Sequence, residues 1–413
     1  MARFSLRKHT VIHTYLEDIA LDLKLSDRVQ SIKPSPTLAV TNRAAELRAA
    51  GKDIIGLGAG EPDFDTPQHI KDAAIEAINS GFTKYTAVDG TPALKTAIIN
   101  KFKRDNGLDY EANQILVSCG GKQSFFNLAL ALLNAGDEVV IPAPYWVSYP
   151  DMVLVAEGVP VVIETDASTR FKITPEQLDS AITNKTKLVV LNSPSNPSGM
   201  AYSKAELEAL GAVLRKYPEV LIATDDMYEH ILWTEEPFNN ILTANPDLYD
   251  RTIVLNGVSE AYSMTGWRIG YAAGPQKLIA SMKKIQSQST SNPTSVAQVA
   301  AQAALDGDHE CVKDMVKVFK QRHDFMVKEL NAIDGIECLE GDGTFYLFAD
   351  FSGMQAKLDC ETDNDLAEKL LEAGVALVPG SSFGTPGFMR LSFATSDENL
   401  QKAIERLKNA SNG

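Results

Sequence analysis

Short apolar runs rich in β-branched residues alternate with stretches of helical periodicity along most of this chain. The runs Glu138–Ile141, Lys187–Leu191 and Val220–Thr224 have the length and composition of buried strands, and the stretches Gln123–Asn134 and Ser203–Lys216 have those of helices. Such alternation is typical of βα units, whose strands pair in parallel and whose helices cover the sheet. We therefore predict an α/β fold with a mostly parallel sheet.

The pattern changes after Pro293, where long helical stretches run to about Leu330 and are followed by strands at Thr344–Asp350 and Met389–Phe393. A further strand, Ile54–Leu57, is predicted near the other end of the chain. We expect both chain ends to form a small α+β domain beside the large one. The predicted segments are an N-terminal extension or leader at 1–21, an arm with part of the small domain at 22–66, the large domain at 67–305 and the C-terminal small domain at 306–413.

Composition excludes several classes of partner. The formal net charge of -15 argues against nucleic acid or an anionic membrane surface. No apolar run approaches the roughly 20 residues that span a bilayer, and the first twenty residues lack the long apolar core of a secretory signal. The four cysteines have no metal-type spacing, so we predict no metal site and a reduced, cytoplasmic chain.

The stretch Asn256–Tyr271, which reads NGVSEAYSMTGWRIGY, carries the densest set of polar and aromatic residues. An apolar run, Thr252–Leu255, leads into it, and a second short strand is predicted at its end, Arg268–Tyr271. A polar loop held between two buried strands is where an α/β enzyme usually keeps its reactive groups.

Two other segments favour anions. The turn Cys119–Gln123 places two glycines and Lys122 at the start of an apolar helix, where backbone N–H groups and the helix dipole attract phosphate. A tight connection without any ligand would give the same pattern. Arg390 lies inside the apolar run Met389–Ala394, and a buried guanidinium is costly unless an anion pairs with it.

Three segments at strand ends leave two interpretations open. Trp146 could stack on a flat heteroaromatic ring or belong to the core. The stretch Asn192–Gly199 has two prolines and a glycine, which ordinarily indicate a turn. Asp225 could bind a ligand or cap the next helix.

In combination these segments resemble the fold-type I aminotransferases, which use pyridoxal 5′-phosphate (PLP), and most closely the bacterial-type aspartate aminotransferases of class I. The most specific matches are Asn196–Gly199 (NPSG) and Met264–Tyr271 (MTGWRIGY), and the matches follow the family's order from about Leu25 to Leu407. The resemblance implies a large domain with a mostly parallel seven-stranded sheet between helices, and a small α+β domain.

The resemblance also implies a role for individual residues. The matches to the family's cofactor contacts are Gly121, Lys122, Ser259 and Arg268 at the phosphate and Trp146, Asn196, Asp225 and Tyr228 at the ring. Asp225 and Tyr228 are catalytic in the family, since the acid keeps the pyridine nitrogen protonated and the tyrosine reaches the 3-oxygen. Tyr85 matches a tyrosine offered to the neighbouring subunit's phosphate, which implies a homodimer.

Substrate contacts follow from the same resemblance. The matching residues are Gly60, Lys122, Trp146, Asn196, Arg390 and Lys33. Family members of the main subgroup bind the distal carboxylate with an arginine, but the matching segment Ser287–Asn292 has none, whereas Lys122 matches the lysine of the bacterial subgroup. Lys33 matches a residue used by relatives that accept prephenate. A dicarboxylic amino acid, aspartate or glutamate, with its 2-oxo acid is therefore the expected substrate pair.

Glu260 stands where the family has the lysine that forms the Schiff base with the cofactor. A carboxylate cannot form an imine, so we expect a severely impaired aspartate aminotransferase with non-covalent PLP, pyridoxamine phosphate or a PLP–amino acid external aldimine. Three interpretations stay open: a variant of an active parent, a non-catalytic PLP-binding or regulatory protein, and an enzyme repurposed with Glu260 as its base. PLP lyases of the same fold are a substrate-level alternative, but they also need the lysine.

Overall fold

The computed structural model describes residues 23–412, so the predicted extension at 1–21 lies outside the described residues. Seven strands form the main sheet in the order β2-β8-β7-β6-β5-β3-β4. Their bounds are β2 Ile115–Ser118, β3 Glu138–Pro142, β4 Val159–Ile163, β5 Thr186–Asn192, β6 Leu221–Asp225, β7 Thr252–Gly257 and β8 Gly270–Ala273. All neighbours pair in parallel except β8, which is antiparallel to β7 and β2, so the predicted mostly parallel sheet is confirmed.

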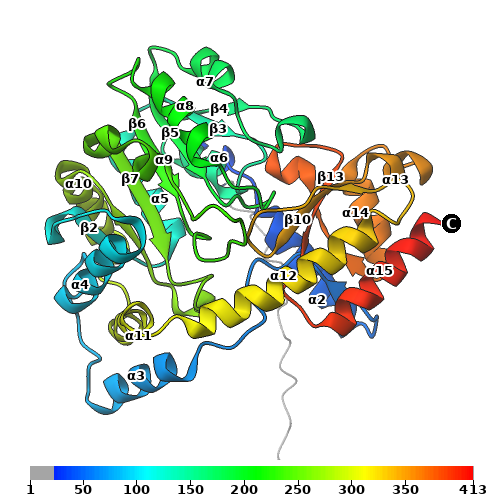
Figure 1. The fold of residues 1–413 in the computed structure, drawn as a ribbon, viewed down its shortest axis with the longest axis horizontal. Helices are drawn as coiled ribbons and strands as arrows, with labels where there is room; N and C mark the ends of the chain where they lie inside the picture. The colour runs from blue at the N-terminus through cyan, green and yellow to red at the C-terminus, as the bar shows by residue number, and fades with distance from the viewer. Residues whose placement is uncertain (1–22, 413) are drawn as a thin grey trace, which may run out of the picture.

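Helices bury both faces of this sheet (Figure 1). Side chains alternate along a strand, so in β3 Val139 and Ile141 pack on one face while Val140 packs on the other. The helices of the first face are α5 Gly121–Leu132, α6 Ser148–Val155 and α10 Gln276–Ser287. Those of the second face are α7 Pro175–Ala181, α8 Lys204–Leu214 and α9 Ile241–Ala244.

Three further helices pack together beside the β2 end of the sheet: α3 Gln68–Asn79, α4 Pro92–Lys101 and α11 Ser295–Asp306. Capping boxes at Thr174 and Ser203 begin α7 and α8. Within residues 23–412 no helix is both long and apolar enough to cross a lipid bilayer.

The two ends of the described chain come together in a second, smaller body. The two-stranded parallel sheet pairs β1 Ile55–Gly56 with β11 Val375–Ala376. The antiparallel sheet has the order β12-β13-β10-β9, with β9 Glu337–Cys338, β10 Tyr346–Asp350, β12 Val378–Pro379 and β13 Phe388–Ser392. Its helices are α2 Pro36–Ala49, α12 Glu310–Leu330, α13 Ser352–Lys357, α14 Asp363–Glu372 and α15 Asp397–Ser411.

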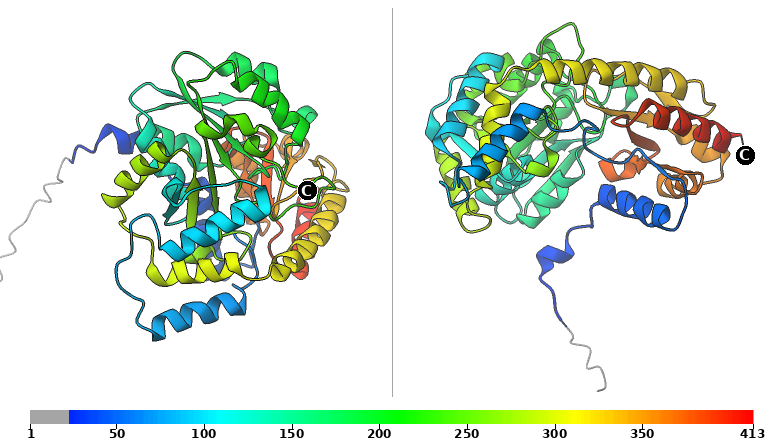
Figure 2. Two further views of the ribbon diagram at one scale, coloured as in Figure 1. Left: turned by 60° about the vertical axis from the view of Figure 1, so that its left-hand side comes forward. Right: turned by 90° about the horizontal axis from the view of Figure 1, so that it is seen from below.

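Figure 2 shows α2, near the start of the described chain, beside the helices of the C-terminal part, while α1 Asp27–Gln30 projects away from it. A small body built from both chain ends agrees with the sequence pattern, and the domain boundaries given above stay predictions.

One predicted strand is wrong by two residues. Arg268 was expected to begin a strand, but it has a left-handed backbone (φ 56°), and β8 begins at Gly270. The reason is a close approach: a Cβ on Gly270 would lie 2.2 Å from the backbone nitrogen of Gly121, so only glycine lets β8 run beside the start of α5. The left-handed turn before it directs the Arg268 side chain across that helix start.

Candidate active site

A cavity of about 320 Å³ lies at the carboxyl ends of the parallel strands. This edge of a parallel sheet is where loops from several strands meet, and ligands bind there in open α/β sheets. The predicted site residues that line the cavity are Gly60, Gly121, Lys122, Trp146, Asn196, Asp225, Tyr228, Ser259, Glu260, Arg268 and Arg390. Residues from opposite ends of the chain, such as Gly60 and Arg390, therefore share one cavity.

Two predicted residues do not line it. Tyr85 is 93% exposed, and Lys33 is exposed with its backbone N–H 3.4 Å from Oδ1 of Asp151. The single chain does not bring either residue to the cavity, and their assigned roles stay predictions.

Glycines and an arginine shape one end of the cavity. Gly120 has φ +89°, and a Cβ there would lie 2.2 Å from Nη2 of Arg268. The guanidinium therefore lies directly against the N-terminus of α5, where the backbone N–H groups have no helical partner. Arg268 also donates through Nη1 to the carbonyl oxygen of Thr265 at 2.8 Å, which holds it in place.

Lys122, in the first turn of α5, adds a second positive charge at this end. Its ammonium lies 5.1 Å from the ring centroid of Trp146. Burial lowers the pKa of Lys122, and the nearby Arg268 lowers it further. Within the described residues neither cation forms an ion pair with a carboxylate, so this end of the cavity suits an external anion such as a phosphate.

Asp225, the last residue of β6, lies deeper in the cavity. Its Oδ2 accepts a hydrogen bond of 2.5 Å from the Tyr149 hydroxyl, and its Oδ1 accepts one of 3.3 Å from the backbone N–H of Met227. Burial raises the pKa of the Asp225 carboxyl to about 6, and these two donors oppose the rise. At pH 7 the carboxylate is mostly ionised, so it can pair with a protonated ring nitrogen.

Arg390 forms the opposite end of the cavity. It is 2% exposed on β13, and its guanidinium donates to Oδ1 of Asn196 at 3.0 Å and to the carbonyl oxygen of Gly58 at 2.7 Å. The guanidinium carbon lies 4.4 Å from the ring centroid of Tyr346. Its Nε has no hydrogen-bond partner among the described residues. A buried guanidinium held by neutral groups alone fits a ligand carboxylate.

Glu260 follows β7 and lies among these groups. Its Oε2 is buried and has no hydrogen-bond partner among the described residues. Burial raises the pKa of the Glu260 carboxyl to about 8; Glu61 and Asp225 contribute to the rise, while Arg268 and Arg390 oppose it. The carboxyl is therefore mostly neutral at pH 7, and a cation beside it would favour its ionised form.

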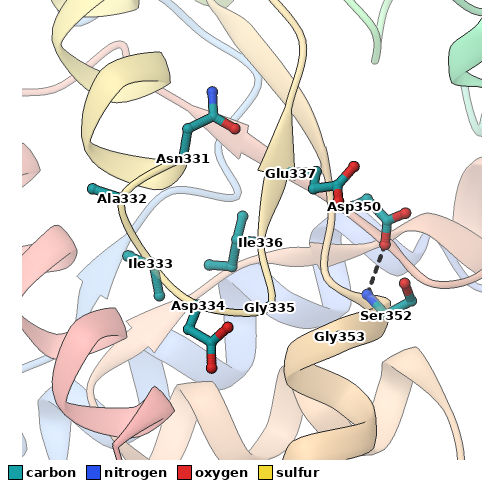
Figure 3. Close-up of a pocket in the computed structure, with 10 residues that line it drawn as sticks. All are labelled: Asn331, Ala332, Ile333, Asp334, Gly335, Ile336, Glu337, Asp350, Ser352 and Gly353. Carbon is teal, nitrogen blue, oxygen red and sulfur yellow. Dashed lines mark hydrogen bonds between the residues drawn. The ribbon is translucent and has the colours of Figure 1, made fainter.

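A larger pocket of about 580 Å³ lies between the end of α12, β9 and the start of α13 (Figure 3). Its charged side chains, Asp334, Glu337 and Asp350, are all acidic, and no basic residue lines it. Oδ1 of Asp350 accepts a hydrogen bond of 2.7 Å from the backbone N–H of Ser352. This pocket lacks the groups that hold an anion, so the smaller cavity is the candidate site.

Among the residues that contact predicted site residues, Tyr149, Asn192 and Tyr346 were not predicted. Tyr149 and Asn192 fall inside sequence stretches that the motifs already contain, but nothing in the sequence says that they contact Asp225. Tyr346, on β10, lies 3.3 Å from the Tyr228 hydroxyl, and a Cβ on Gly60 would lie 2.9 Å from its hydroxyl oxygen. No local pattern marks Tyr346, because its place in the site depends on how the small body packs on the large sheet.

The sheet, the cationic helix start and the buried Arg390 together define an α/β protein whose cavity has groups suited to a phosphate and to a carboxylate. Residues 52–407 match the family model "Aminotransferase class I and II". The chain belongs to the class I and II aminotransferases, which confirms the family to which the sequence motifs pointed.

Similar proteins cover nearly the whole chain. An aspartate/prephenate aminotransferase of Nitrosomonas europaea is 62% identical over 392 residues, which are 93% of this chain and 99% of that protein. An aspartate aminotransferase of Geobacillus stearothermophilus is 52% identical over 386 residues, 93% of this chain and 98% of that protein.

Solved structures agree with this fold. An aspartate aminotransferase from Rhizobium meliloti has a TM-score of 0.91 at 49% identity and covers 94% of this chain and 99% of its own. The aspartate aminotransferase from Thermus thermophilus with maleate has a TM-score of 0.88 at 43% identity, and the match covers 94% of this chain and 100% of that one.

The family implies PLP as cofactor, and the cavity fits its non-covalent contacts. The Arg268 guanidinium against the start of α5 suits the phosphate, and Asp225 suits the ring nitrogen. Glu260 is the exception, since a carboxyl group cannot hold the aldehyde covalently.

We expect the stability of the cofactor-free protein to fall as the pH rises. The pKa of Glu260 is about 8 in the folded state and 4.5 in the unfolded chain. The contribution of Glu260 to the free energy of unfolding is complete below pH 4.5 and is lost as the pH rises to 8. The reason is that Glu260 ionises at lower pH in the unfolded chain than in the folded protein. The free energy of unfolding, measured in urea, should fall between pH 5 and pH 8.5. Glu260→Gln should make this fall smaller by on the order of a few kcal/mol.

Asp226, whose pKa burial also raises to about 8, is present in both proteins and contributes equally to both profiles. Identical pH profiles for the two proteins would mean that Glu260 is ionised in the folded state.

Proposed function

We propose that this chain has an aspartate aminotransferase scaffold that binds a PLP-type cofactor without a covalent link, and that amino transfer between aspartate or glutamate and 2-oxo acids is severely impaired. The observation that carries the proposal is Glu260, a buried carboxyl with an unpartnered oxygen in a cavity whose other groups suit the cofactor and a carboxylate substrate. The similarity to an aspartate aminotransferase and an aspartate/prephenate aminotransferase supports the substrate class.

When bound, PLP supplies an aldehyde that takes up the amino group and a pyridinium ring that withdraws electrons from it. Arg268, with Ser259, Lys122 and the N-terminus of α5 around Gly121, would hold the phosphate. Asp225 would keep the ring nitrogen protonated, and Trp146 would stack on the ring. Asn196 and Tyr228 would contact the 3-oxygen. All of these residues line the cavity.

Arg390 is the proposed partner of the substrate's α-carboxylate, with the backbone of Gly60 beside it. Its free Nε and its two neutral hydrogen-bond partners support this assignment. Lys122, which has no carboxylate partner among the described residues, is proposed for the distal carboxylate, and its pKa is lowered by burial. Lys33 is a candidate for prephenate, on the resemblance alone.

Glu260 occupies, on this proposal, the position of the family's cofactor lysine. That lysine has two tasks, to hold the aldehyde and to move a proton between substrate and cofactor carbons. A carboxyl group cannot do the first. Its raised pKa leaves it mostly protonated at pH 7, so it is also a poor proton acceptor there.

Two alternatives rest on the same residue. A non-catalytic PLP-binding or regulatory protein would keep every non-covalent contact and convert no substrate, and the intact cavity supports it equally. An enzyme repurposed with Glu260 as base would need the carboxyl ionised, which a cationic ligand beside it would favour. Slow conversion of aspartate and 2-oxoglutarate separates an impaired enzyme from a pure binding protein.

A homodimer is part of the proposal. Tyr85 is almost fully exposed, and Ile75, Ile78 and Phe82 are exposed apolar side chains on α3 and the turn after it. Such a patch on a monomer favours a protein interface, and a second copy would bring Tyr85 to the partner's phosphate site. We also propose a cytoplasmic location, because the four cysteines are free thiols.

The aminated cofactor should bind more tightly than the aldehyde. The ammonium of pyridoxamine phosphate can donate to the Glu260 carboxylate, a contact of about 1.5–3 kcal/mol. Ionising a carboxyl with a pKa of about 8 costs about 1.4 kcal/mol at pH 7, so the preference should reach tenfold above pH 8, where Glu260 is ionised in the free protein as well. Because the pKa of Glu260 is about 8, binding at pH 7 should release a proton. Calorimetry of the apoprotein in PIPES and in Tris, two phosphate-free buffers with different heats of ionisation, measures both quantities.

Glu260→Gln is the matched control and should lose both the preference and the proton release. Tighter binding of PLP than of pyridoxamine phosphate to the unsubstituted chain would mean that Glu260 does not face the amino group.

Restoring the lysine should restore activity. In the Glu260→Lys variant the neutral lysine amine can condense with the cofactor aldehyde to an imine, with loss of water, so transamination of aspartate should rise by several orders of magnitude. Borohydride reduction and mass spectrometry should find a cofactor-sized adduct on residue 260 of the variant and none on the unsubstituted chain. A variant that binds cofactor covalently but stays inactive would favour the non-catalytic alternative.

The oligomeric state can be measured directly. Light scattering at micromolar concentration should give the mass of a dimer, twice 44.9 kDa. Ile78→Asp should weaken the association, because it places a charge in the apolar patch, while the exposed Leu339→Asp should not. A stable monomer that still binds cofactor tightly would contradict the role proposed for Tyr85.

A further inference from the structure

The side chain of Asn192 joins the two loops that carry Asn196 and Asp225. Asn192 is the last residue of β5, and its Cα pairs with that of Asp225, the last residue of β6. Its Oδ1 accepts a hydrogen bond from the backbone N–H of Asn196 at 2.8 Å, and its Nδ2 donates to the carbonyl oxygen of Asp225 at 2.9 Å. One amide group thus bonds to the main chain of both loops at once.

The two bonds are not equally replaceable. The Asp225 carbonyl also accepts a hydrogen bond from the backbone N–H of Ser193 at 3.3 Å. Asn196 is buried, and its N–H has no acceptor besides Asn192 among the described residues. A buried N–H without a partner is costly, so the Asn196 loop depends on the Asn192 amide more than the Asp225 loop does.

These bonds belong to a longer chain of contacts across the cavity. Tyr149 donates to the Asp225 carboxylate, and Arg390 donates to the side-chain oxygen of Asn196. Asn192 lies between these two pairs and itself lines the cavity. Asn192 therefore connects the Asn196 loop, which Arg390 of β13 contacts, to the end of β6.

We propose that Asn192 is a positioning residue: it sets Asn196 relative to Asp225, and so aligns the contacts to two edges of one pyridine ring. This inference rests on the proposed function, which assigns Asn196 to the 3-hydroxyl and Asp225 to the ring nitrogen. Asn192 acts through these two residues and need not touch the ring itself.

The experiment compares two ligands by calorimetry, pyridoxamine 5′-phosphate and its 3-deoxy analogue. The unsubstituted protein should prefer the first by about tenfold, the effect of one well-placed hydrogen bond. In Asn192→Ala the Asn196 loop is no longer held, so the ratio of the two affinities should fall to less than about threefold. Most of the lost affinity should be that for pyridoxamine 5′-phosphate, the ligand that has the hydroxyl. If Asn192 had a purely structural role, its loss would lower the affinity for both ligands by the same factor.

Two further variants sharpen the test. Asn192→Asp keeps an oxygen that accepts the Asn196 N–H, so the preference should survive even where overall binding weakens. Asn245→Ala is the matched control, because its buried amide also donates to main-chain carbonyls, those of Leu207 and Ile241, but outside the cavity. It should reduce stability and leave the preference unchanged.

An unchanged preference in Asn192→Ala overturns the inference, as does its loss in Asn192→Asp or an equal loss in Asn245→Ala. If the unsubstituted protein binds neither ligand, the proposed function fails and this inference fails with it. If Asn192→Ala does not fold, a loss of the preference in Asn192→Asp still overturns the inference.

Discussion

The central strands of the large sheet are buried on both faces, and this constraint arranges everything else in the molecule. Strands β3, β5, β6 and β7 run parallel, so their side chains must be apolar on both sides and their polar residues can appear only where the strands end. At the carboxyl edge those ends meet. Asn192 and Asp225 are the terminal residues of β5 and β6, and α5 begins at the same edge.

The charges of the cavity complement a ligand that is anionic at two ends. Lys122 and Arg268 lie at one end and Arg390 at the other, each held by neutral groups or by none. The two carboxyls between them have raised pKa values because burial disfavours their ionised forms. Glu260 is the more affected of the two, since no donor reaches its Oε2, whereas Tyr149 donates to Asp225.

Much of the fold could be predicted from local patterns. The β-branched runs mark β3, β5 and β6 closely, and the capping boxes at Thr174 and Ser203 mark two helix starts, because both signals depend on neighbouring residues only. The prediction at Arg268 was wrong for the opposite reason. Its left-handed turn precedes Gly270, whose backbone packs against Gly121, a residue distant in the chain. Tyr346 could not be predicted for the same reason, since it reaches the site from a separate sheet.

The sequence by itself determined the chemical groups available to the site and the family of the chain, because motifs such as Asn196–Gly199 and Met264–Tyr271 are local and specific. Only the tertiary structure decided which groups share a cavity and in which state of charge. It joined Asn192 to both Asn196 and Asp225 and left Tyr85 and Lys33 outside. It also buried Glu260 without a partner for Oε2. Distances, burial and pKa values depend on packing between distant segments, and no local pattern in the chain contains them.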